Sequence, residues 1–197
     1  FVKIMTKNIL LLLCIFYFIS CKGQDKTKKL NFPQVGWTLS IPANSDFLTA
    51  LQFDSLQNAT KNKTDLNIEL SKDEVLFVIR KNNYNYFGSS VTVFDSANFK
   101  NCETSYSFYK KSLIDLFLSK ADQITLLDTA SSIEKIDGLT FQKFYTKTAY
   151  PNQNLTLENY WYYRKQGNLE LSINILFDNK KNGDAYLELL TGSKFKK

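Results

Sequence analysis

The 197-residue chain contains no histidine. That absence removes the commonest general base and the commonest zinc ligand, together with every Ser-His or Cys-His catalytic pair. The chain also has only seven glycines, and none belongs to a glycine-rich loop that would cradle a phosphate group. We therefore expect a protein that is not an enzyme and that uses no cofactor and no metal ion.

Long hydrophobic runs are also missing, with one short exception. Residues Ile9–Ile19 form an apolar run of about 11 residues, whereas a membrane-spanning helix needs roughly 20. The run follows Lys7 and ends at Ser20, which fits the hydrophobic region of a signal peptide. We expect the true start of translation at Met5, because Phe1 is not an initiator residue.

The boundary Phe18-Ile19-Ser20-Cys21 resembles the end of a bacterial lipoprotein signal peptide. Phe18 stands where leucine is commonest, and the signals of Bacteroidota are looser at that position. The resemblance implies removal of residues 1–20, a diacylglyceryl thioether on Cys21 and acylation of the new amino group. One acyl chain holds a protein only marginally, so two or three chains make such an anchor effectively permanent. The alternatives are an ordinary cleaved secretory signal and a buried core strand.

Cysteine is scarce. Cys14 leaves with the expected signal peptide and Cys21 is the expected lipidation site, so Cys102 remains alone and no disulfide can form within the mature chain. We expect Cys102 to be buried as a small apolar group. A helix N-terminus can lower a thiol pKa, but no histidine is present to activate Cys102 and Glu103 beside it opposes ionisation.

A strong excess of positive charge is lacking as well. Residues 1–20 carry two lysines and no acidic residue, so their removal lowers the formal net charge from +6 to +4. The basic pairs are scattered and form no stripe with interleaved aromatic residues, so we expect no nucleic-acid partner. The absence of acidic residues directly after Lys22 favours an outer-membrane protein that faces the periplasm.

The remaining chain divides into a tether and one domain. Residues 21–31 hold the lipidated Cys21 and a polar segment that we expect to be flexible. Residues 32–197 are long enough for one domain with a real hydrophobic core, and no linker splits them.

Alternating apolar residues predict strands over residues 35–41, 74–81 and 89–95, with the last two forming a hairpin. Ser45-Asp46 predicts the start of a helix that carries Phe47, Ala50 and Leu51. Residues 60–72 have the composition of a loop.

The second half of the sequence predicts the longest elements. A helix is expected from Glu103 to Ala121, then strands at Ile124–Asp128 and after the turn Asp137-Gly138. Two alternating runs, 155–163 and 169–177, predict a long hairpin, and a short helix follows over 185–190. These elements predict the α+β class.

The order of elements resembles the PsbP-like α/β/α sandwich superfamily, and within it lipoproteins of Bacteroidota that have no assigned function. The resemblance rests on Gly36–Pro42, Lys135–Phe141 and Gly192–Phe195, placed among the expected helices and hairpins. It implies a central, mostly antiparallel sheet with helices on both faces, and proteins that act mostly by binding. It carries over no functional residue.

Two aromatic clusters are candidate binding surfaces. Tyr84, Tyr86 and Phe87 lie on the expected turn between two strands, where loops tend to expose side chains. Residues Tyr160–Tyr163 lie on the long hairpin, where alternation favours burial in the core or under a helix. We take Tyr84, Tyr86 and Phe87 as the possible partner-binding residues.

From the sequence we expect a lipid-anchored envelope protein that binds an unidentified envelope protein or supports an assembly. The alternative is a lipoprotein that binds a small ligand or a glycan in a pocket between sheet and helix. A hydrolase is a third possibility, and it needs a cleft with close carboxylates of raised pKa.

Overall fold

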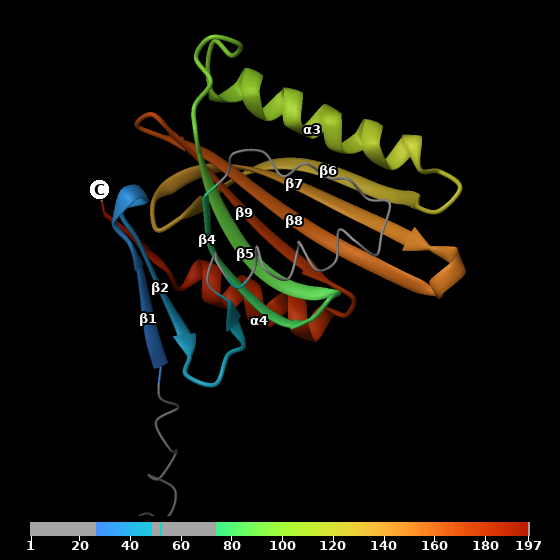
Figure 1. Ribbon diagram of the computed structural model, residues 1–197, viewed down its shortest axis with the longest axis horizontal. Helices are drawn as coiled ribbons and strands as arrows, with labels where there is room; N and C mark the ends of the chain where they lie inside the picture. The colour runs from blue at the N-terminus through green and yellow to red at the C-terminus, as the bar shows by residue number, and fades with distance from the viewer. Residues whose placement is uncertain (1–26, 49–51, 53–73, 197) are drawn as a thin grey trace, which may run out of the picture.

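Two antiparallel sheets and two helices make up the part of the chain that the computed structural model describes, residues 27–48, 52 and 74–196 (Figure 1). Along the chain the elements are β1 (Thr27–Phe32), β2 (Trp37–Pro42), β3 (Phe47–Leu48), β4 (Glu74–Asn82), β5 (Asn85–Val93), α3 (Cys102–Ser119), β6 (Thr125–Ile136), β7 (Leu139–Tyr150), β8 (Leu155–Gln166), β9 (Leu169–Phe177), α4 (Lys180–Thr191) and β10 (Lys194–Phe195). The expected signal peptide, Cys21, Ala50, Leu51 and the expected loop 60–72 lie outside these residues.

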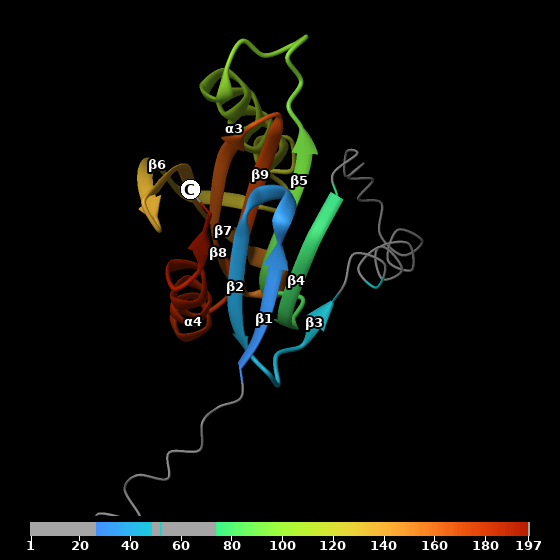
Figure 2. The ribbon, with the colours of Figure 1, turned by 90° about the vertical axis from the view of Figure 1, so that its left-hand side faces the viewer.

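The larger sheet has seven strands in the order β3-β4-β5-β9-β8-β7-β6, and every neighbouring pair is antiparallel. The smaller sheet, β1-β2-β10, is antiparallel too and crosses in front of the larger one in Figure 2. The mostly antiparallel sheet expected from the sequence is therefore confirmed. None of the helices in the described residues is long and apolar enough to cross a membrane.

The main core fills the space between the two sheets and α4. Alternate residues of β9 point into it, and Leu171, Ile173 and Ile175 are fully buried there. Trp37 of β2 and Tyr186 of α4 meet the same core. The predicted long hairpin and closing helix are thus confirmed as β8, β9 and α4.

A smaller aromatic cluster holds α3. Tyr106 of α3 packs on Phe144, Trp161 and Tyr163, which come from β7 and β8. Because Tyr162, between the last two, belongs to the main core instead, the two clusters draw on alternate residues of β8. Asn101 begins the helix through a capping box, in which its side chain accepts from the Thr104 amide at 2.9 Å.

The helix predicted after Ser45-Asp46 is wrong at Phe47. Phe47 lies in β3 and is paired with Ile79 of β4, and the Arg80 amide donates to the Asp46 carbonyl at 3.0 Å. Pairing with the edge of β4 therefore determines the local structure. The helix-start signal is local in the sequence and cannot predict this pairing.

The segment expected as a tether overlaps β1. Thr27 is already paired with Pro42 of β2, although Thr27, Lys28 and Lys29 keep exposed side chains. Backbone hydrogen bonds form this pairing, and they need no apolar side chains. A polar segment can therefore be a strand, which is why the composition wrongly predicted a linker at these residues.

Gly183 of α4 provides a test of how tightly this helix packs on the sheet. A Cβ at Gly183 would meet ring atoms of Phe177 at 2.7–2.8 Å. Overpacking costs about 1–3 kcal/mol, whereas alanine gains about 1 kcal/mol over glycine in a helix. Gly183→Ala should therefore lower the free energy of unfolding in urea, and Lys181→Ala, at an exposed position of the same helix, should not. Equal stability of both variants would contradict this packing.

Candidate functional site

The turn between β4 and β5 presents Tyr84 at the surface. The Asn82 side chain fixes this turn, because its Oδ1 accepts from the Tyr84 amide and from Asn85 Nδ2, both at 2.9 Å. The Tyr84 side chain is 40% exposed, and its hydroxyl donates to Gln153 Oε1 at 3.4 Å. We call residues Asn82–Asn85 the hairpin tip.

The hairpin tip rests on α4 through one buried residue. Asn85 is fully buried, and its Oδ1 accepts from Asn182 Nδ2 at 2.8 Å. The Tyr186 hydroxyl donates to the Asn85 carbonyl at 3.1 Å. Because both partners lie on α4, the helix holds the tip in one position.

Only one of the three predicted aromatic residues is exposed. Phe87 is fully buried and meets Phe77 edge to face at 5.1 Å, so its predicted place on a binding surface is wrong. Tyr86 is half-buried, and burial raises its phenol pKa. The physical reason is that β5 already begins at Asn85, so strand alternation sends Phe87 into the core.

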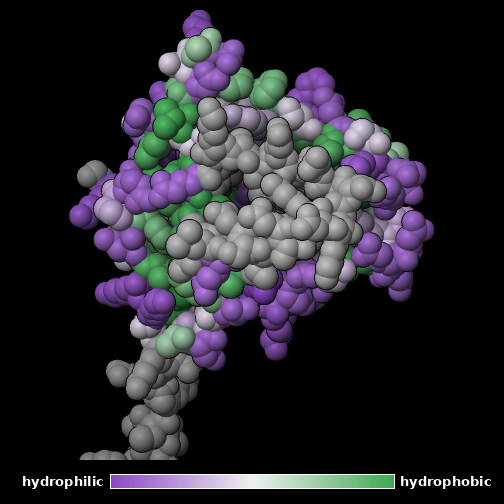
Figure 3. Space-filling view, in the orientation of Figure 1, coloured by the Kyte–Doolittle hydropathy of each residue, from purple (hydrophilic) through white to green (hydrophobic). Residues whose placement is uncertain are grey.

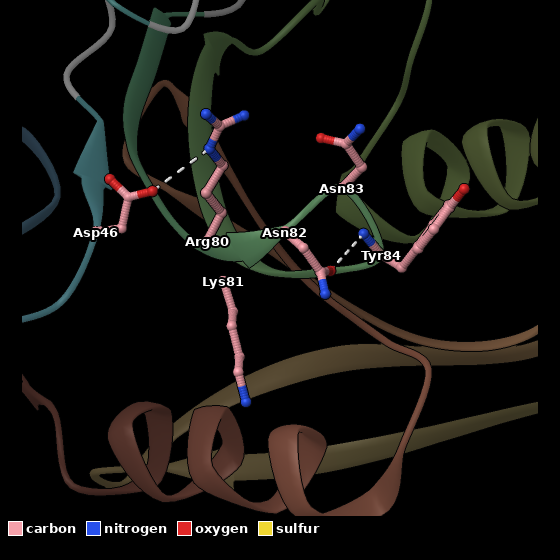
Figure 4. A pocket seen from close by; sticks show the side chains of 6 residues that line it. All are labelled: Asp46, Arg80, Lys81, Asn82, Asn83 and Tyr84. Atoms are coloured by element: carbon pink, nitrogen blue, oxygen red, sulfur yellow. Dashed lines mark hydrogen bonds and ion pairs between the residues drawn. The ribbon is translucent and has the colours of Figure 1, made fainter.

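A shallow polar hollow of about 330 Å³ lies beside the tip (Figure 4). It is lined by Asp46, Arg80, Lys81, Asn82, Asn83 and Tyr84. Arg80 and Lys81 leave β4 on opposite sides; Arg80 Nε lies 3.7 Å from Asp46 Oδ2, and Lys81 Nζ donates to Asn182 Oδ1 at 3.3 Å. The hollow can offer hydrogen bonds of both kinds to a small polar ligand, with Tyr84 at its rim.

A second exposed feature, which the sequence analysis missed, lies at the start of α3. Phe99, Phe108 and Tyr109 contact one another, with ring centroids 5.3–5.8 Å apart. Phe108 is 54% exposed, and hydrophobic residues interrupt the polar surface where α3 lies in Figure 3. We call these three residues the α3 aromatic surface. Nothing in the sequence marked Phe99 as a neighbour of Phe108 and Tyr109.

Beneath α3 lies a buried polar cluster of Ser105, Tyr163 and Glu170. Ser105 Oγ donates to Glu170 Oε1 at 2.5 Å, and the Tyr163 hydroxyl donates to the same oxygen. Glu170 is 2% exposed, and its Oε2 has no hydrogen-bond partner among the described residues. Burial, together with the hydrogen bond to Glu170, raises the pKa of Tyr163, so this tyrosine stays neutral.

Cys102 lies next to this cluster as a free, half-buried thiol. Burial raises the pKa of the thiol, and the charge of Glu170 acts in the same direction. Its environment therefore opposes the thiolate that nucleophilic chemistry needs.

The aromatic run Tyr160–Tyr163 is mostly buried, as strand alternation favoured. Trp161, Tyr162 and Tyr163 are at most 8% exposed, and Trp161 Nε1 donates to Ser172 Oγ at 2.7 Å. These residues serve the two cores and leave the hairpin tip, the hollow and the α3 aromatic surface as the exposed candidates.

No protein-family model matches the chain. Among curated proteins, it is similar to conserved oligomeric Golgi complex subunit 1 of Dictyostelium discoideum, with 35% identity over 104 residues. That match covers 45% of this chain, and the chain spans 6% of the length of the relative.

Two solved structures resemble the chain. The solution structure of cyanobacterial PsbP (CyanoP) from Synechocystis has a TM-score of 0.55 and 8% identity, over 90% of this chain and 98% of that one. A crystal structure of a protein from Bacteroides thetaiotaomicron has a TM-score of 0.45 and 12% identity, over 86% of this chain and 48% of that one. The first likeness confirms the PsbP-like fold and, at such low identity, shows the fold alone.

The buried cluster should be important for stability. Tyr163→Phe removes one of the two hydroxyl groups that donate to Glu170 Oε1, and one hydrogen bond contributes about 0.5–1.5 kcal/mol to stability. We expect a loss of that size in urea unfolding. Tyr84→Phe, which removes an exposed hydroxyl, is the matched control and should change stability little. A Tyr163→Phe variant as stable as the control would contradict a structural role for the cluster.

Proposed function

We propose that the chain is a non-enzymatic, lipid-anchored module that binds a protein partner in a bacterial cell envelope. The α3 aromatic surface is the observation that carries this proposal. Aromatic residues, phenylalanine and tyrosine included, are enriched in protein interfaces relative to the rest of the surface. Tyr84 at the hairpin tip is a second, smaller contact in the proposal.

The α3 aromatic surface suits a protein partner because its rings are ordered in advance. Phe99, Phe108 and Tyr109 already pack on one another, and Tyr109 also meets the ring of buried Tyr163 at 6.3 Å. Rings that are held before binding lose little conformational entropy when a partner covers them. A protein surface with an apolar pocket is the complementary shape.

The proposal includes a sandwich arrangement and a location. Tyr106 joins α3 to one cluster of β8 and Tyr186 joins α4 to the other, which supports helices on opposite faces of the sheet. The anchor would be Cys21, which lies outside the described residues, in an outer membrane facing the periplasm. Five residues separate Cys21 from β1, and a chain of that length reaches at most about 20 Å. The domain would therefore stay near the bilayer.

A second candidate function is the binding of a small polar ligand or a glycan in the hollow beside the hairpin tip. The alternation of carboxylate, guanidinium, ammonium and amide groups around Tyr84 favours it, since sugars need both donors and acceptors. The lining of this hollow is mainly polar and includes one tyrosine, so it suits a polar ligand rather than an apolar one.

The anchor can be tested by one substitution. Cys21→Ala removes the expected lipid attachment, so the protein should move from the membrane fraction to the soluble fraction of the cell envelope. Immunoblotting of the two fractions measures this, with Cys102→Ala as the control that keeps membrane retention. Retention of Cys21→Ala in membranes would rule out lipid anchoring at this residue.

The partner can be tested by crosslinking in native envelopes, followed by capture and mass spectrometry. We expect one reproducible partner that is lost with Phe108→Ser, because this change removes the most exposed ring of the α3 aromatic surface. Val93→Ser changes an equally apolar side chain that is 66% exposed elsewhere, and it should leave the partner in place.

If Phe108→Ser and Val93→Ser behave alike, the α3 aromatic surface is not the binding site. In that case envelope glycans should be titrated against the purified chain and against Arg80→Ala. Glycan binding that disappears with Arg80→Ala would favour the hollow and the second function.

A further inference from the structure

β6 ends the seven-stranded sheet and offers a long unpaired edge. It has 12 residues and pairs with β7 alone among the strands that the structure describes. It forms the left-hand margin of the sheet in Figure 2. The strand at the opposite end of the sheet, β3, has only two residues.

The turn that follows β6 determines which backbone groups face outward. Asp137 and Gly138 have φ values of +49° and +82°, as in a two-residue type I′ turn. In such a hairpin the flanking residues Ile136 and Leu139 exchange hydrogen bonds, and along the strand this pattern alternates. Thr129, Ser131 and Ile133 therefore direct their amide and carbonyl groups away from β7.

Among the described residues, the middle of β6 carries little of the usual protection of an edge strand, although α3 contacts it through Lys110, whose Nζ donates to Ser131 Oγ at 3.3 Å. Natural edges are blunted by charge, by proline, by a bulge or by a covering element. Residues 129–133 contain no charged residue and no proline, all five are exposed, and the irregularity of the β6–β7 ladder lies before them at Leu126–Asp128. On this edge only Leu127 and Ile133 are large exposed hydrophobic residues, at 52% and 67%.

We propose that β6 pairs antiparallel with β6 of a second copy of this chain, about a two-fold axis at Ala130. Leu127 and Ile133 lie three residues to either side of Ala130. The axis therefore brings Ile133 of each copy to the irregular end of the other strand, where Leu127, the extra residue of the β6–β7 ladder, is its apolar neighbour. Between these two apolar pairs, Thr129 faces Ser131 of the second copy, and cross-strand hydroxyl and apolar pairs stabilise a sheet.

The neighbouring registers are less favourable. A two-fold axis perpendicular to the sheet must pass through a residue, because otherwise facing side chains would point to opposite sides. An axis at Ser131 places Asp128 of each copy opposite Glu134 of the other, which makes two such pairs. Like charges directly opposite each other are destabilising. An axis at Ser132 brings Asp128 against Ile136 and leaves Leu127 without an apolar neighbour. The axis at Ala130 avoids both faults.

The oligomeric state tests the proposal. Light scattering of the purified full chain over a dilution series should give a mass of twice 22.8 kDa at the higher concentrations. Ile133→Lys should halve this mass, because it buries four-carbon ammonium side chains in both apolar pairs. Val93→Lys changes a residue of matching exposure, 66%, on another strand and should keep the dimer. A single-chain mass for the unsubstituted protein would overturn the proposal.

The register is tested by disulfide crosslinking with oxidised glutathione. Ala130→Cys places two thiols across the axis, so it should give a covalent dimer on a non-reducing gel. Ser132→Cys, also exposed, places them about 13 Å apart along the strands, beyond the reach of a disulfide. Efficient crosslinking of Ser132→Cys but not Ala130→Cys would overturn the axis at Ala130. The unsubstituted chain controls for the native cysteines.

Discussion

The two sheets are held together by the burial of one indole ring. Trp37 of β2 is fully buried and stacks on Phe195 of β10 at 5.4 Å with an angle of 6° between the rings. It also meets Phe32, Phe77 and Phe87, so side chains of β1, β4, β5 and β10 converge on it. Each such pair contributes about 0.5–1.5 kcal/mol beyond area burial. Together they exceed the roughly 1–3 kcal/mol cost of the indole N–H, which has no partner among the described residues.

This central packing leaves the exposed features at the periphery of the molecule. The hairpin tip is held by Asn85 against α4, and the buried residues of α3 are only Ser105 and Tyr106, near its N-terminus. The rest of α3 stays largely exposed beside β6. Stability and the proposed recognition of a partner thus involve different residues. Tyr163 links them, because it contacts both Glu170 and the ring of Tyr109. The candidate surfaces can change without disturbing the core around Trp37.

The sequence predicts those elements whose own periodicity matches their burial. β8, β9 and α3 form where the sequence predicts them, since each is long and its pattern continues over many residues. The prediction for Phe47 fails because its conformation depends on β4. The prediction for Phe87 fails because β5 starts at Asn85, four residues before the predicted strand. Phe99 and Phe108 could not be found, because their contact depends on how the chain between β5 and α3 returns to the helix. Contacts of that kind require the tertiary structure.

The exposure pattern of β1 has a mechanical consequence for a domain that is pulled from its N-terminal side. Force would enter at Thr27, where the first three residues of β1 hold on to β2 through backbone pairing while their side chains remain in solvent. The buried Leu30 and Phe32 lie at the far end of the strand, next to the core around Trp37. Under load the strand therefore peels in two stages: a weak stage that releases about 10 Å of chain, then a resisting stage at Leu30. The first residues of β1 would therefore detach and extend before the rest of the domain begins to unfold.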